Sequence, residues 1–149
     1  MRKIIFTRPD GGLSVVHPSR NTIGETLTTD AEIEQRSWNK LPVDAINSVF
    51  IDESAIPTDR TFRNAWEHGG DLITQNIIKA KEIAHDKRRQ ARSAEFAPLD
   101  IKATIPSEAV AAEMARALIR TKYATMQAEI DAATTINALT ARITALENA

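Results

Sequence analysis

A tight turn between two short apolar runs constrains the start of the chain. The string Pro9-Asp10-Gly11-Gly12 separates the apolar run Ile4–Phe6 from a second run, Leu13–Val16. Proline fixes φ, and glycine accepts the positive φ that tight hairpin turns require. β-Branched and aromatic side chains favour strands. The pattern predicts an antiparallel hairpin that ends before Pro18, because proline cannot donate a ladder hydrogen bond.

The next segment predicts a loop, a short helix and a strand. Residues 20–28 are polar and irregular, as in a loop. Residues 29–32, Thr-Asp-Ala-Glu, have capping-box spacing, which predicts a helix from Asp30 to about Trp38 that Pro42 closes. Residues 45–52 are the following strand candidate. Together with the hairpin, these elements define an expected β-rich region over residues 1–57.

The segment after residue 57 contains the densest cluster of informative residues. Thr58 or Asp59 can cap a second short helix, residues 60–67, and Phe62 and Trp66 would then share one face at i and i+4. An aromatic pair of this kind either belongs to the core or anchors a partner protein, and the core is the commoner role. We keep both interpretations open and include Phe62, Arg63 and Trp66 among the candidate partner-binding residues. Glycines at 69 and 70 end the helix before a short strand at 71–75.

Helical patterns fill the rest of the expected second region, residues 58–149. A long helix is predicted from Ile77 to about Ala94, with Pro98 disturbing or ending it. Another is predicted from Pro106 to about Ile130, since proline is tolerated in a first turn. The apolar face expected for the first helix comprises Ile77, Ala80, Ala84, Ala91 and Ala94, widened by Ile78 and Ile83. The face expected for the second follows a three–four spacing of mostly small residues that permit close helix packing: Val110, Met114, Ala117, Thr121, Ala124 and Ala128.

The last segment has the most regular periodicity. Ile136, Leu139, Ile143 and Leu146 are spaced three, four and three, as in the seam of a coiled coil. We call these four residues the C-terminal seam. The seam needs an apolar surface to cover it, either an earlier helix of the same chain or another copy. Its four residues complete the candidate partner-binding set, on a C-terminal helical arm.

Composition narrows the class of protein. The chain has 149 residues, a formal charge of -1 and no cysteine, so disulfides and thiolate metal sites are excluded. The small net charge disfavours a strongly basic nucleic-acid binder. No apolar stretch approaches the length of a membrane span, and the N-terminal apolar run is too short for a signal peptide. We therefore expect an α+β protein made in the cytoplasm, with neither nucleic acid nor membrane insertion in its function.

The familiar signatures of catalysis do not occur in the sequence. The histidines, His17, His68 and His85, are far apart and lack a metal-ligand spacing. There is no nucleophile elbow and no phosphate-binding loop. The basic run at residues 87–92 shares its helix with the acidic residues Glu82, Asp86 and Glu95, so a solvated helix face is favoured over a phosphate-binding surface. We expect no enzymatic activity, no cofactor and no metal.

Several strings resemble a group of small proteins of tailed phages and prophages. The string from Asp59 to Trp66, Asp-Arg-Thr-Phe-Arg-Asn-Ala-Trp, is similar to the group's hallmark. The hairpin at residues 3–17, with its Asp-Gly-Gly turn, precedes it as in that group. A basic helix of the KAxxIxxDxxRxAR kind follows at residues 79–92, and residues 131–135 are similar to a recurrent tail. Pro106 departs from the group's pattern, in which a helix continues.

The resemblance implies a tailed-phage gene product of the kind found among virion or tail-fibre genes. It implies a structural protein of the virion, such as a tail-fibre, fibre-anchoring or connector component, present in several copies and bound to other tail or neck proteins. It supplies no catalytic residue. Two alternatives remain open: a tail-fibre assembly chaperone, and a host-directed inhibitor, both of which would be absent from the finished virion.

Overall fold

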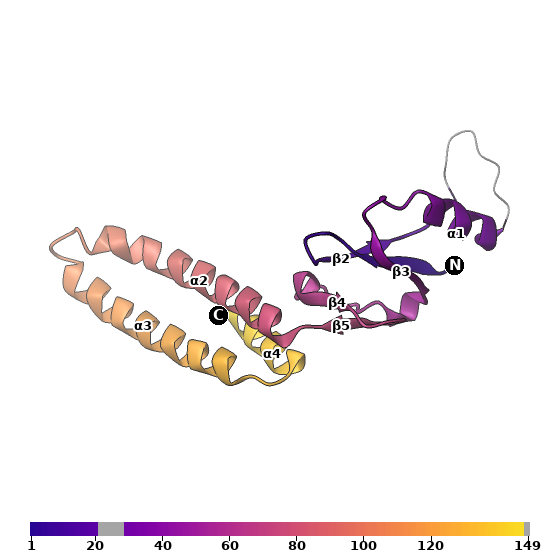
Figure 1. Ribbon diagram of the computed structural model, residues 1–149. Helices are drawn as coiled ribbons and strands as arrows, with labels where there is room; N and C mark the ends of the chain where they lie inside the picture. The colour runs from indigo at the N-terminus through magenta and orange to yellow at the C-terminus, as the bar shows by residue number, and fades with distance from the viewer. Residues whose placement is uncertain (21–28, 148–149) are drawn as a thin grey trace. The chain divides into compact units, whose positions relative to one another are not determined.

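The computed structural model describes residues 1–20 and 29–147, and it confirms the predicted α+β fold. Two small antiparallel sheets and a short helix come first, and three longer helices follow (Figure 1). The chain divides into two compact units, Met1–Asn76 and Ile77–Ala149. We call them the N-terminal unit and the helical unit and describe each by itself. The loop predicted at residues 20–28 lies, except for Arg20, outside the described residues.

The main sheet of the N-terminal unit has the order β2-β1-β3, with all pairings antiparallel. Its strands are β1 (Lys3–Thr7), β2 (Leu13–Val16) and β3 (Ile46–Ile51). The predicted hairpin is confirmed: Gly11 has a φ of 79°, and Asp10 Oδ1 accepts a hydrogen bond of 2.8 Å from the amide of Gly12. A register shift interrupts the β1–β3 pairing opposite Asn47, whose positive φ is typical of a bulge.

The central strand β1 is buried on both faces. Ile5 points into a cluster with Leu13, Ile51, Trp66 and Ile73. Ile4 and Phe6 point to the opposite face and are also buried. Because both faces of β1 are covered, this strand is the centre of the N-terminal unit.

Helix α1 (Asp30–Asn39) covers the second face of the sheet. The predicted capping box is present, since Thr29 Oγ1 accepts from the amide of Glu32 and the Glu32 carboxylate accepts from the amide of Thr29. Trp38 stacks on Phe50 of β3, with 4.8 Å between ring centroids. Arg2 fastens the helix to the strand, because its guanidinium donates to the buried carboxylate of Glu34 at 2.8 Å and lies 4.4 Å from the Phe50 ring centroid.

The helix predicted over residues 60–67 is wrong. Two short 3-10 turns, η1 (Glu53–Ala55) and η2 (Arg63–Ala65), lead into strand β4 (Trp66–His68). Strand β4 pairs with β5 (Ile73–Gln75) around a turn in which Gly70 has a φ of 84°. Burial of Trp66 against the main sheet, together with the β4–β5 ladder, outweighs the local helix signal.

The unit boundary follows from this second sheet. The sequence placed the division between residues 57 and 58, whereas the structure divides after Asn76. Trp66 and Ile73, from β4 and β5, complete the cluster around Ile5, so this segment belongs with the sheet and not with the helices. The backbone amide of Asn76 donates to the carbonyl of Ala65, which closes the N-terminal unit.

The helical unit consists of α2 (Ile77–Lys102), α3 (Ala109–Ala132) and α4 (Ile136–Glu147). Helix α2 continues past Pro98, contrary to the predicted break near that residue. Proline removes one backbone donor, but Ala94 and Pro98 lie on the exposed side of α2, where solvent can reach the carbonyl left without its helical partner. Pro106 falls in the turn between α2 and α3 and not within the first turn of α3.

Removal of the Trp66 side chain tests the core of the N-terminal unit. We expect Trp66→Ala to lower the free energy of unfolding by about 3–5 kcal/mol, because a large buried side chain is replaced by a cavity. Both tryptophans lie in this unit, so fluorescence of Trp38 during denaturant unfolding reports the change. The matched control Arg63→Ala, at an exposed position of the same segment, should change the value by less than about 0.5 kcal/mol. An equally small effect of Trp66→Ala would contradict the assignment.

Candidate functional site

The predicted site residues of the N-terminal unit are mostly part of its core. Phe62 and Trp66 are both buried, and Trp66 packs in the cluster around Ile5. Arg63 is exposed. The indole Nε1 of Trp66 is buried without a hydrogen-bond partner. In this structure the two aromatic rings serve the core, the role that the sequence favoured, and only Arg63 of the three is accessible.

The C-terminal seam lies in α4 and packs within the chain. Leu139 and Ile143 are buried, and Ile136 and Leu146 are half-buried. Helix α4 contacts α2 more extensively than α3, and Lys87 of α2 forms an ion pair of 3.3 Å with Glu147 near the end of α4. The sequence left two ways to cover the seam, an earlier helix of the same chain or another copy. In the structure an earlier helix of the same chain covers it.

Helix α3 buries a different face from the one that the sequence predicted. Its buried residues are Ala112, Tyr123, Met126 and Ile130. The predicted face is exposed along its whole length: Val110 is 75% exposed, Met114 68%, and its small residues are exposed as well. Leu118, one turn beyond Met114, is 73% exposed. Because alanine and methionine occur on both sides of this helix, its apolar pattern alone did not identify the face that packs within the chain.

The length of α4 explains why part of the helical unit lacks a third helix. At 1.5 Å per residue, α2 and α3 are about 39 and 36 Å long, whereas α4 is about 18 Å long. Helix α4 ends beside Lys87 and Ala91. The remainder of the α2–α3 hairpin has only two helices, and Ile101 and Ile105 near its turn are exposed. Two helices cannot enclose an apolar core as three can, so other contacts must hold this part together.

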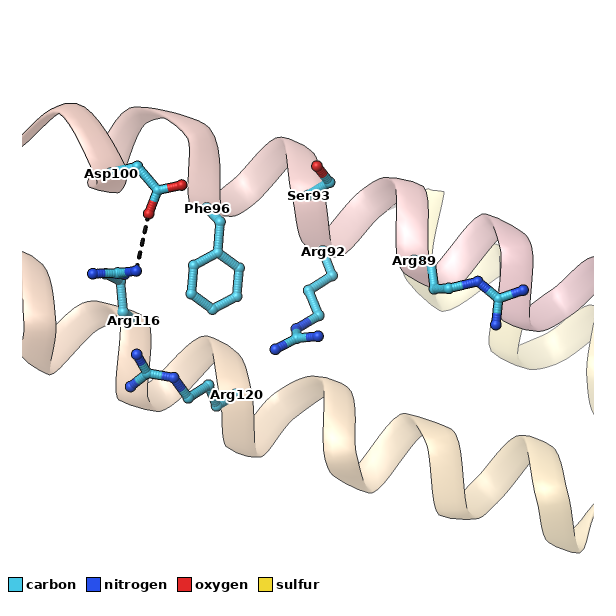
Figure 2. Close-up of a pocket in the computed structure, with 7 residues that line it drawn as sticks. All are labelled: Arg89, Arg92, Ser93, Phe96, Asp100, Arg116 and Arg120. Atoms are coloured by element: carbon cyan, nitrogen blue, oxygen red, sulfur yellow. Dashed lines mark ion pairs between the residues drawn. The ribbon is translucent and has the colours of Figure 1, made fainter.

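An arginine-rich groove lies in this two-helix part of the hairpin. The groove has a volume of about 470 Å³, and its lining residues come from α2 and α3: Arg89, Arg92, Ser93, Phe96, Asp100, Arg116 and Arg120. Figure 2 shows the Phe96 ring between the two helices, with Arg92 beside it and with Arg116 and Arg120 reaching toward it from α3. The guanidinium carbons of these three arginines lie 5.2, 5.7 and 6.0 Å from the ring centroid. We call this site the Phe96 groove.

Carboxylates neutralise most of the charge of the Phe96 groove. Arg116 pairs with Asp100 and with Glu113, both at 3.1 Å, and Arg120 pairs with Glu113 at 2.8 Å. The hydrogen bond from Arg120 lowers the pKa of Glu113 below its ordinary value. Arg89 pairs with Asp86. Within residues 1–20 and 29–147, Arg92 is the groove arginine with no carboxylate partner. Cation–π contacts and ion pairs in the Phe96 groove therefore hold the two helices together. A single arginine without a carboxylate partner makes only a weak anion-binding site.

A partly buried polar network joins the same two helices closer to α4. The carboxylate of Glu95 accepts from Tyr123 Oη at 2.6 Å and from Lys122 Nζ at 2.7 Å. These hydrogen bonds, that from Lys122 first, lower the pKa of Glu95 below its ordinary value. Burial, and then the hydrogen bond to Glu95, raises the pKa of the Tyr123 hydroxyl. Arg88 is also buried and donates to the carbonyl of Tyr123 at 3.4 Å, so this residue of the basic run does not lie on the solvated face that the sequence suggested.

His85 of α2 contacts a carboxylate of α3. His85 Nε2 lies 2.9 Å from Asp131 Oδ1, a contact between α2 and α3 that residue spacing could not reveal. No group of three or more potential metal-ligating side chains occurs in the described part of the chain. None of the helices within the described ranges has both the length and the apolarity needed to cross a bilayer.

Comparisons of the chain with models of known families, with curated proteins and with solved structures find no match. The candidate site therefore rests on geometry alone. The exposed apolar face of α3 has three large apolar side chains that are open to solvent: Val110, Met114 and Leu118. Sequence reasoning identified most of its residues but expected them to be covered.

A pH measurement tests the Glu95 network. A carboxyl whose pKa is lowered on folding stabilises the protein above its unfolded-state pKa, and this stability is lost as the pH falls through the lowered folded value. We expect Glu95→Gln to reduce the free energy of unfolding by about 1 kcal/mol near neutral pH, a modest figure because the side chain is partly exposed. The variant should also lose part of the decline that the unmodified protein shows below about pH 4.5.

The readout is far-ultraviolet circular dichroism, because the helical unit contains most of the helix. Glu82→Gln, at an exposed position of the same helix, is the matched control and should preserve the acid-dependent decline. Identical pH profiles for Glu95→Gln and the unmodified protein would show that the network adds no stability.

Proposed function

We propose that the protein is a structural component of a tailed-phage virion, in or next to the tail fibre, and that it acts by protein–protein assembly. The phage assignment rests on the resemblance of residues 3–17, 59–66, 79–92 and 131–135 to small phage proteins. Its partners would be other tail or neck proteins and further copies of itself. The chain would be made in the bacterial cytoplasm and retained in the particle.

The observation that carries the assembly mode is the exposed apolar face of α3. Val110, Met114 and Leu118 lie at intervals of four residues, so their side chains form one row along the helix. Scattered exposed apolar residues are ordinary, but a continuous row on a rigid helix is typical of a protein-binding surface. Covering this row would remove apolar area from water without rearranging the core, which favours association over catalysis.

The proposal predicts that the chain copurifies with phage particles. Quantitative mass spectrometry of gradient-purified particles should find it at a fixed ratio to the portal and fibre proteins, because a structural component has a set copy number. A phage replication protein, abundant in the lysate and absent from particles, is the control for contamination. Detection in the infected-cell lysate alone would reject the virion assignment and favour the assembly chaperone or the host-directed inhibitor.

A further inference from the structure

The exposed face of α3 is a strip with a charge only at one edge. At 3.6 residues per turn, the residues within about 60° of the direction of Met114 lie on one side of the helix. In α3 they are Val110, Ala111, Met114, Ala117, Leu118, Thr121, Thr125, Ala128, Glu129 and Ala132. Glu129, at the edge of this side, is half-buried and pairs with Arg142 of α4, and the others are exposed. We call the uncharged members of this set the outer strip, which extends over about six turns of helix.

The heptad spacing of the outer strip is that of a helix that packs on another helix. Val110, Met114, Ala117, Thr121 and Ala128 fall on a repeat of alternating four- and three-residue steps, with Ala124 between the last two. The repeat covers nearly three heptads, which is longer than the C-terminal seam. Helix α3 thus has a helix-packing pattern on two opposite faces, and the described chain supplies helices for only one of them.

The sizes of the side chains indicate what covers the outer strip. Its first half contains the large residues Val110, Met114 and Leu118, and its second half contains the small residues Thr121, Thr125 and Ala128. Two copies of α3 placed antiparallel about a two-fold axis between residues 117 and 118 would set Val110 against Thr125 and Met114 against Thr121. Each large residue then faces a small one, so the two helices can approach evenly. A parallel pairing would place large side chains against large ones at the N-terminal end of the two helices. It would leave a gap between the small side chains at the C-terminal end.

The charges along the two edges balance in the antiparallel arrangement. A two-fold axis between residues 117 and 118 brings Glu113 of one copy near Arg120 of the other, and the reverse pair follows by symmetry. On the other edge the same axis brings Glu108 of one copy near Glu129 of the other, also twice. Within each chain Arg120 already pairs with Glu113, and Arg142 with Glu129. The sizes of the side chains, and not the charges, therefore favour the antiparallel register.

We propose that the outer strip of α3 binds the outer strip of a second copy of this chain, antiparallel, to form a symmetric dimer. The inference deepens the proposed function, on which it rests, by naming the first contact of the assembly. The two α2–α3 hairpins together form a four-helix arrangement in which each α3 is covered on both faces. Close approach is possible because alanine and threonine line half of each strip.

Association of the full chain tests the dimer. Sedimentation equilibrium at micromolar concentration should give twice the monomer mass. Met114→Asp and Leu118→Asp each place an unpaired carboxylate in the apolar contact, so each should weaken association by about a hundredfold or more and give the monomer. Both positions are exposed in the single chain, so the helix content should not change. The matched control Ala97→Asp, at an exposed position of α2, should preserve the dimer. A monomeric unmodified protein would overturn the inference.

Engineered cysteines test the direction of pairing, since the natural chain has none. Ala117→Cys lies beside the two-fold axis and should form a disulfide between copies on mild oxidation. Ala128→Cys should not, because antiparallel pairing separates the two equivalent positions by about 30 Å, far beyond the reach of a disulfide. Efficient linkage through residue 128 would overturn the antiparallel arrangement. A monomeric chain that is still found at a fixed ratio in virions would reject the dimer and leave the proposed function intact.

Discussion

Helix α3 has a helix-packing pattern on two opposite faces, and within the described residues only one of them is covered. One face buries Tyr123, Met126 and Ile130 against the other helices of the chain. The opposite face, the outer strip, has the same spacing and a charged residue only at its edge, yet it is open to solvent. Because α4 is about half as long as α3, the chain cannot complete a bundle along the whole hairpin. The Phe96 groove and its ion pairs hold the two-helix part together, and the outer strip remains available for another protein.

The two units differ in how completely they bury their own apolar residues. In the N-terminal unit β1 is buried on both faces, with Trp66 on one side and α1 on the other. Arg2 and Glu34 fix that helix through a hydrogen-bonded ion pair, and the hydrogen bond from Arg2 lowers the pKa of the Glu34 carboxyl. The N-terminal unit therefore encloses its own core, whereas the helical unit leaves the apolar row Val110, Met114 and Leu118 exposed. In our proposal the N-terminal unit is the closed head, and the helical unit provides the assembly surface.

The sequence correctly predicted the elements that depend on short-range signals such as turn residues, helix caps and apolar spacing. The Asp-Gly-Gly turn, the capping box at Thr29 and the spacing of the C-terminal seam gave the hairpin, α1 and α4 close to their observed positions. Prediction failed where tertiary contacts decide. Trp66 lies on a strand and not on a helix because β4 pairs with β5 and the Trp66 side chain packs against the main sheet. Helix α2 continues through Pro98 because that side of the helix is exposed to solvent. The face of α3 that packs could not be read from its periodicity, since both faces follow a helix-packing repeat.

The most direct test of a covered outer strip compares two methionines on opposite faces of α3. Met114 is 68% exposed and Met126 is 9% exposed in the single chain. Peroxide oxidation, followed by peptide mass spectrometry over a range of protein concentrations, reports the exposure of each thioether. The account predicts that Met114 oxidises rapidly in dilute protein and becomes protected as the concentration rises, while Met126 stays protected and Met1 stays reactive throughout. Oxidation of Met114 at one unchanged rate, at every concentration, would contradict the pairing of outer strips.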